Sequence, residues 1–266
     1  MKKVDSHTHS EHSADGHVPI SEMVETAVRS GGKYLCITDH LDLDALQDYN
    51  NAPKGWTQLD VQAYEADLLC ERERAPKGFY LGFGVEVGFD ENTYDGYEKI
   101  INELPLDAVI NSVHFVDGYD VYFADYFNDR AKSDAYGAYL KKVRQSLEVP
   151  YRYDIVGHIG YCVRNAGYAD KLMHYAEFEE LLEPILKRII ELDKTLEVNT
   201  HHALCPNEEI LKKYYEFGGR KVSFGSDAHR GDVYKDFDET VKMLKSIGFK
   251  GFTYFINHEE HFEPFD

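Results

Sequence analysis

Cysteines are few in this sequence, and long apolar runs are absent. The four cysteines, Cys36, Cys70, Cys162 and Cys205, form no Cys-x-x-C pair, which argues against a disulfide scaffold and favours free thiols in a reducing compartment. No stretch approaches the roughly 18 consecutive apolar residues of a membrane span. Two N-terminal lysines precede no apolar run, so we expect no signal peptide, no membrane partner and a cytoplasmic protein.

Positive charge is also scarce. The chain has 29 Lys and Arg residues against 48 Asp and Glu, a net charge of −19 with neutral histidine. A surface this acidic repels nucleic acid and anionic membranes at long range, so neither is an expected partner. A local positive site for an anion is still compatible with this charge, because bound metal ions would create one.

The 266 residues are 43% hydrophobic and contain no repeat or linker-like segment, which predicts a single domain over residues 1–266. Short apolar runs alternate with helix-like segments throughout. One such helix is predicted to begin at a Ser21 cap and to end at Gly31-Gly32. This order favours a parallel sheet with helices outside it, either closed as a β/α barrel or open and doubly wound. The predicted strands are residues 2–6, 34–38, 80–86, 107–113, 153–158, 195–199, 221–226 and 251–256.

Residues that bind metals follow almost every predicted strand. A lone histidine is more often a core residue than a metal ligand, but chance does not explain metal-binding residue types at nearly every strand end. Glu86, between Val85 and Val87, is also costly to bury without a partner. In a barrel these strand ends meet at one mouth, where imidazole and carboxylate together suit zinc, manganese or iron. The residues are His7, His9, His40, Glu86, His114, His158, Asp227 and His229.

These strand ends resemble the motifs of the PHP (polymerase and histidinol phosphatase) family, in the family order and over nearly the whole chain. Residues 84–88 and 156–164 resemble the histidinol-phosphatase branch. The resemblance implies a distorted seven-stranded (β/α)7 barrel, similar to a TIM barrel, with its metal site at the C-terminal ends of the strands. The strand at 251–256 would then be an extra strand or the closing one. The motifs are His7-Thr8-His9, Thr38-Asp39-His40, Gly84-Val85-Glu86, Ser112-Val113-His114, Gly157-His158 and Gly225-Ser226-Asp227-Ala228-His229.

The resemblance also implies three divalent metals per chain. Asp15 is assigned by spacing alone, and a turn residue before Gly16 explains it nearly as well. Glu86, Asp227 and His229 would be the catalytic members of the set. The implied ligands are His7, His9, Glu86 and Asp227 for the first metal, Glu86, His114 and His158 for the second, and Asp15, His40 and His229 for the third.

The implied reaction is hydrolysis of a phosphomonoester, with L-histidinol phosphate of histidine biosynthesis as the substrate. A hydroxide bridging two metals would attack phosphorus in line. The sequence has no cysteine with an arginine six residues later, and no Walker loop. Three alternatives stay open: a family member acting on a nucleotide or a phosphotyrosyl protein, an amidohydrolase-type C–N hydrolase, and a non-catalytic metal-binding domain. Glu86 and the Thr-Asp-His strand end argue against the second, and the filled ligand set against the third.

Arg164, six residues after His158, is the predicted phosphate clamp, because its planar fork suits a phosphate. The chain departs from the histidinol-phosphatase pattern after Asn199-Thr200, where His201 and His202 stand in place of another arginine. We expect His201 or His202 to take over its role. His17 is expected near the substrate or at the surface. The sequence does not predict an oligomeric state.

Overall fold

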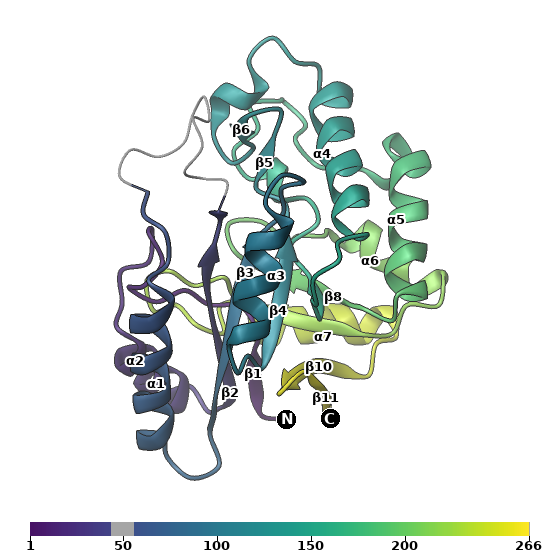
Figure 1. Cartoon of the computed structure of the whole chain (residues 1–266). Helices are drawn as coiled ribbons and strands as arrows, with labels where there is room; N and C mark the ends of the chain where they lie inside the picture. The colour runs from purple at the N-terminus through teal and green to yellow at the C-terminus, as the bar shows by residue number, and fades with distance from the viewer. Residues whose placement is uncertain (44–55, 266) are drawn as a thin grey trace.

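In the computed structural model, which describes residues 1–43 and 56–265, seven parallel strands form one sheet (Figure 1). The two edge strands meet: the Ser6 N–H donates to the Phe224 carbonyl at 2.8 Å, and the Asp227 N–H to the His7 carbonyl at 2.8 Å. The sheet is therefore a nearly closed barrel, which confirms the predicted fold and excludes the open alternative. Its strands in order are β1 (Lys3–Asp5), β2 (Gly32–Leu41), β3 (Tyr80–Gly88), β4 (Ala108–Ser112), β7 (Ile155–Val156), β8 (Thr195–Asn199) and β9 (Val222–Gly225).

Helices lie outside the strands, as the alternation predicts (Figure 1). Each has an apolar side toward the sheet; α7, for example, buries Phe237, Val241 and Leu244. Burying one such side chain contributes about 1.5–3 kcal/mol. The described helices are α1 (Ile20–Arg29), α2 (Val61–Arg74), α3 (Tyr94–Glu103), α4 (Lys132–Ser146), α5 (Glu179–Glu191), α6 (Glu208–Glu216) and α7 (Phe237–Ile247). None of the helices in the described ranges is both long and apolar enough to cross a membrane.

The predicted cap of the first helix is wrong. Helix α1 begins at Ile20, Pro19 precedes it with a φ of −58°, and Ser21 lies inside the first turn without capping it. Proline is suited to this place because its fixed φ matches a helix start and its missing N–H is not needed there. The other end is as predicted, since Gly31 adopts a φ of +79° just after the helix.

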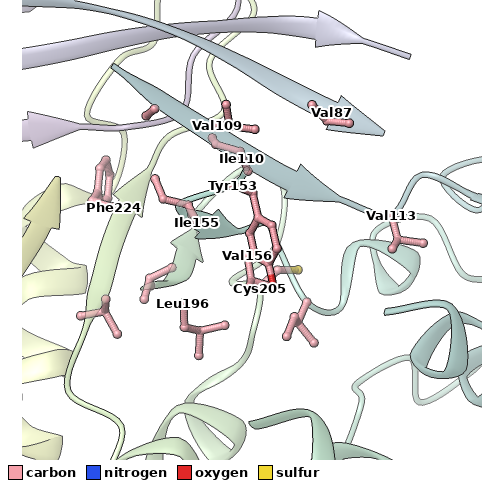
Figure 2. Close-up of a cluster of buried hydrophobic side chains, with 14 of the residues drawn as sticks. Val87, Val109, Ile110, Val113, Tyr153, Ile155, Val156, Leu196, Cys205 and Phe224 are labelled. Atoms are coloured by element: carbon pink, nitrogen blue, oxygen red, sulfur yellow. The ribbon is translucent and has the colours of Figure 1, made fainter. Parts of the chain in front are cut away.

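The apolar core contains side chains from neighbouring strands, on both faces of the sheet. Figure 2 shows Val109 and Ile110 of β4 in one cluster with Ile155, Leu196 and Phe224 of β7, β8 and β9. All five are buried. Parallel strands covered on both faces have such continuous apolar sequences, so a polar side chain within one of them marks a special position.

The strand predicted at 251–256 is present but does not belong to the barrel sheet. It is β10 (Gly251–Ile256), and it pairs antiparallel with β11 (Glu259–Pro264). The resulting hairpin contacts the N-terminal ends of barrel strands: the Tyr34 hydroxyl donates to the Phe255 carbonyl at 2.8 Å, and the Asn257 N–H to Asp107 at 2.9 Å. The hairpin therefore covers the N-terminal end of the barrel and leaves the opposite end for a site.

A short second hairpin follows β4 and was not predicted. It consists of β5 (Phe115–Val116) and β6 (Tyr119–Asp120), which pair antiparallel. The turn residues Asp117 and Gly118 both have positive φ, of 52° and 77°, which is the conformation that an Asp-Gly pair favours in a type I′ turn. This turn brings Asp120 opposite Phe115, close to the C-terminal end of β4.

We expect Asp107→Ala to destabilise the fold by about 3–5 kcal/mol, the range for breaking a buried ion pair. Asp107 is buried, forms an ion pair with Arg72, and accepts hydrogen bonds from the backbone N–H groups of Phe83 and Asn257 at 2.7 and 2.9 Å. Urea unfolding of the variant measures the loss. Glu103→Ala, at an exposed position, is the control. Equal unfolding midpoints for both variants would contradict a stabilising role of Asp107.

Candidate metal centre

Glu86 lies at the centre of the cluster of predicted ligands. It is fully buried in β3, and its Oε2 atom is 3.2 Å from His7 Nε2, 3.5 Å from His9 Nε2 and 3.1 Å from His40 Nδ1. Glycines occupy the alternate positions beside it, and a Cβ at Gly88 would lie 1.8 Å from an Asp42 oxygen. The strand therefore offers one long polar side chain on this face and space around it.

The other oxygen of Glu86 faces a second pair of histidines. Oε1 is 2.7 Å from His158 Nε2 and 3.2 Å from His114 Nε2. Both histidines stand two residues beyond a strand, after β7 and β4. The two oxygens thus face different imidazoles, which is the arrangement expected of a carboxylate shared between two ions.

The first predicted ligand set comes together around Asp227. His7 and His9 follow β1 as alternate residues, and their Nε2 atoms are 3.0 Å apart. Asp227, two residues after β9 and with a φ of 52°, places Oδ1 at 3.2 Å from His9 Nε2 and 3.7 Å from His7 Nε2. These strands meet where the barrel closes, so closure and assembly of this part of the site are the same event.

Asp15 lies between the two histidines that the third set assigns to it. Its Oδ2 atom is 3.3 Å from His229 Nε2 and 3.7 Å from His40 Nε2. The ring of His9 lies 4.1 Å from that of His229 and 4.3 Å from that of His40. The third group of predicted ligands is therefore contiguous with the first.

Several polar atoms in this cluster fit a bound cation. Glu86 Oε2, Asp15 Oδ1, His40 Nδ1 and His229 Nε2 are buried and make no hydrogen bond, which is costly unless something else satisfies them. Metal-binding atoms of His7, His9 and Asp227 lie within 4.8 Å of one another, as do those of His9, His40 and His229. Imidazole nitrogen and carboxylate oxygen suit zinc, manganese and iron.

Two carboxylates that the sequence analysis did not single out fix the orientation of the histidines. Glu197 of β8 places one oxygen 2.6 Å from His7 Nδ1 and accepts the His158 backbone N–H with the other at 2.6 Å. A carboxylate only accepts, so His7 Nδ1 donates, and the Nε2 lone pair is left for the cluster. Asp42 Oδ1 contacts His114 Nδ1 in the same way, at 3.2 Å. Glu197, between Leu196 and Val198, has the same signal in the sequence as Glu86.

Without a bound ion, electrostatics favour the metal-binding form of the two carboxylates and of His9, whereas nearby carboxylates raise the pKa values of His7, His40, His114 and His229. Burial alone would raise the pKa of Glu86, but His7 and His114 hold it well below its usual range. Burial would likewise raise the pKa of Asp227, but the neighbouring His7 and Arg164 outweigh burial and hold this pKa well below normal. Burial, together with the adjacent imidazoles, holds the pKa of His9 well below normal. Ionised carboxylates and a neutral imidazole are the forms that bind metals.

A cavity of about 520 Å³ opens beside the cluster, and Arg164 lines it. Arg164 is only 5% exposed, and its Nη2 donates to Asn199 Oδ1 at 2.8 Å and to Asp227 Oδ2 at 2.9 Å. A buried guanidinium that lines a cavity beside the predicted metal ligands is consistent with the predicted phosphate clamp, and a surface position is excluded.

The other predicted substrate contacts also line the cavity, at different depths. His201 lies closer to the cluster than His202, with its ring 5.5 Å from that of His229, and burial lowers the pKa of His201 to about 4. His17 Nε2 is 3.3 Å from the guanidinium of Arg230. The further cavity-lining residues not found from the sequence are Ala14, Asp42, Trp56, Phe115, Asp120, Tyr122, Phe123, Tyr161, Arg230, Asp232 and Lys235.

Comparison with known proteins agrees with this fold and shows the family. Residues 5–201 match the family model described as "PHP domain", and the chain belongs to that family. A probable histidinol-phosphatase of Clostridium acetobutylicum is 28% identical over 92% of this chain and 94% of its own, and a histidinol-phosphatase of Lactococcus lactis is 28% identical over 94% and 93%. A crystal structure of histidinol phosphate phosphatase from L. lactis, complexed with zinc, L-histidinol and phosphate, superposes with a TM-score of 0.87 at 25% identity over 98% of this chain and 99% of that one.

We expect Glu197→Gln to weaken zinc binding about 10–100-fold, because the amide NH2 would face a donor, either His7 Nδ1–H or the His158 N–H. Titration calorimetry on metal-free protein measures the affinity, and thermal unfolding of the same samples separates affinity from folding. Glu191→Gln, at the exposed end of α5, is the control. Equal zinc affinity for Glu197→Gln and the control would show that the carboxylate does not orient His7.

Proposed function

We propose that the chain is a metal-dependent phosphatase that hydrolyses L-histidinol phosphate to L-histidinol and phosphate. The observation that supports this best is Glu86, whose two oxygens face five imidazoles at the C-terminal end of a barrel beside the buried Arg164. The relatives named histidinol-phosphatase, and the similar structure complexed with zinc, L-histidinol and phosphate, support the choice of substrate.

Three divalent transition metals per chain would be held by the ligand sets described above. His7, His9, Glu86 and Asp227 would hold the first, and Glu86 is shared with the second. When bound, such ions supply Lewis acidity that lowers the pKa of water and offsets charge on a phosphoryl group. The chain's own carboxylates and imidazoles set where that positive charge lies, in a protein whose net charge is otherwise −19.

Arg164 binds the phosphoryl group in this proposal. Asn199 and Asp227 hold Nη2, so the guanidinium has a fixed plane, and Arg164 would donate from the cavity wall to a phosphoryl oxygen. Charge-assisted hydrogen bonds of this kind strengthen as charge moves onto those oxygens during P–O cleavage. Asp227 also contacts His9, so Arg164 and the predicted metal ligands are held in a fixed position relative to each other.

Glu197 and Asp42 hold protons at defined atoms. Each accepts from a histidine Nδ1, of His7 and of His114, so that the opposite nitrogen of each ring stays directed at Glu86. This fixes the ligands before substrate arrives, and preorganised sites lose little energy to rearrangement during reaction. His17, His201 and His202 stay predicted substrate contacts.

The function is tested by measuring phosphate release from L-histidinol phosphate and from an aryl phosphate, with added manganese and with a chelator. We expect rapid hydrolysis of L-histidinol phosphate that the chelator abolishes and manganese restores. Preference for the aryl ester would keep the phosphatase and reject the substrate. Turnover that survives complete removal of metal would reject the metal-dependent mechanism.

Arg164→Ala is expected to lower kcat/KM for L-histidinol phosphate about 10- to 150-fold, the loss of charged hydrogen bonds worth about 1.5–3 kcal/mol. Arg164→Lys keeps the charge without the planar fork and is expected to recover only part of that loss. Arg220→Ala, which removes an arginine that donates to the Tyr215 and Gly219 carbonyls, is the control. Steady-state kinetics check all three, and wild-type kinetics for Arg164→Ala would leave the arginine without a role.

A further inference from the structure

Asp39, the middle residue of the motif Thr38-Asp39-His40, is fully buried and bonds to the loop that follows β1. Its Oδ1 atom accepts the Ser10 backbone N–H at 2.6 Å and the Ser13 hydroxyl at 2.8 Å, and its Oδ2 atom accepts the Ser10 hydroxyl at 2.5 Å. Burial raises the pKa of Asp39, and these donors oppose the rise because they stabilise the ionised form. One carboxylate thus fixes two serines of the same loop.

The Ser13 hydroxyl connects this carboxylate to two predicted metal ligands. Its oxygen is 3.2 Å from His9 Nδ1 and accepts the His40 backbone N–H at 3.0 Å. A hydroxyl has one hydrogen, and Asp39 takes it because an ionised carboxylate only accepts. Ser13 can therefore only accept from His9, which places the ring proton on Nδ1 and leaves a lone pair on Nε2. Nε2 is the atom of His9 that lies 3.2 Å from Asp227 Oδ1, within the cluster.

The same loop carries the carboxylate predicted for the third metal, Asp15. The Ser13 N–H donates to the Ser10 carbonyl at 3.1 Å, and the Gly16 N–H donates to the Ser13 carbonyl at 3.1 Å, so the chain turns tightly on both sides of Ser13. A Cβ at Gly16 would lie 1.7 Å from the Ser10 carbonyl oxygen, so the turn needs glycine there. Because Asp39 holds Ser10 and Ser13, it also fixes where Asp15 lies.

We infer that Ser13 is a positioning residue that holds the His9 proton on Nδ1, and that Asp39 sets this direction by accepting the only hydrogen of the Ser13 hydroxyl. The inference rests on the metal-dependent function proposed above, but not on the identity of the substrate. Both residues act through His9 and touch neither metal nor substrate. An imidazole held in this tautomer presents Nε2 to a metal ion without first moving a proton.

The test compares Ser13→Ala with Ser133→Ala, which removes the hydroxyl of an exposed serine in α4. Titration of metal-free protein with zinc in a calorimeter measures the affinity. We expect Ser13→Ala to weaken zinc binding about 10- to 100-fold, the usual effect of losing a group that orients a ligand, and Ser133→Ala to leave it unchanged.

Proton–nitrogen NMR of the zinc-loaded protein then observes the His9 Nδ1–H directly. We expect this proton to be protected from exchange with water in wild type. In Ser13→Ala it should resonate upfield and exchange faster, because its acceptor is gone. A serine with a merely structural role would lower the unfolding temperature and leave this proton unchanged.

Two substitutions of Asp39 test the direction of the hydrogen bond. Asp39→Ala frees the Ser13 hydrogen to turn toward His9, so we expect the same loss of zinc affinity and the same change at Nδ1–H. Asp39→Asn keeps an oxygen that accepts from Ser10 and Ser13, and should recover most of the affinity. Thermal unfolding of the metal-free samples shows which variants fold, and if Asp39→Ala does not, Ser13→Ala and Asp39→Asn still decide.

Wild-type zinc affinity or an unchanged Nδ1–H signal in Ser13→Ala would overturn the inference, as would an equal loss of affinity in Ser133→Ala. The measurements do not use the substrate, so the two proposals can fail separately. Zinc binding that depends on Ser13, in a protein that hydrolyses no phosphate ester, would reject the proposed function and keep this inference. A wild-type protein that binds no zinc would reject both.

Discussion

The concentration of imidazoles around the buried Glu86 is the constraint on which the rest of the molecule depends. Burying a carboxylate in an apolar strand is unfavourable by itself. The imidazoles within about 3 Å of it also lose their hydration, which adds to the cost. The barrel makes the arrangement feasible because it is stabilised elsewhere, through a large apolar core between sheet and helices. The carboxylates Glu197 and Asp42 then fix which ring nitrogen of their histidines faces inward.

The two ends of the barrel divide these tasks. At the N-terminal end the β10–β11 hairpin satisfies backbone and side-chain groups of the strands, with Asp107 and Asp154 each bonded to it. His258 takes part in this closure, 2.7 Å from Asp154, although its place in an acidic tail suggests a solvated side chain. The C-terminal end, relieved of this structural task, holds groups that would be destabilising in a core. A substitution at one end of the barrel can therefore leave the structure of the other end unchanged.

The strands and their polar ends are predictable from the sequence because both signals are local. Alternation places His7 and His9 on one side of a strand end, and apolar neighbours make Glu86 stand out. The contacts that give these residues partners are not local: Glu197 and His7 are 190 residues apart. Asp120 was missed for a different reason, since its Asp117-Gly118 turn is a good hairpin signal but the strands have only two residues each. The strand β11 was missed because its residues are mostly charged and exposed.

The spread of the predicted metal ligands along the chain has a consequence for biosynthesis. His7 emerges from the ribosome well before its partners Glu86, Glu197 and Asp227, which follow over more than two hundred positions. A partly made chain offers only the His7-His9 pair, a weak chelator, and the complete set forms only when β9 meets β1. Metal capture therefore comes last, and because ions that bind the folded state add to its stability, loading would mark a finished barrel and protect it from unfolding.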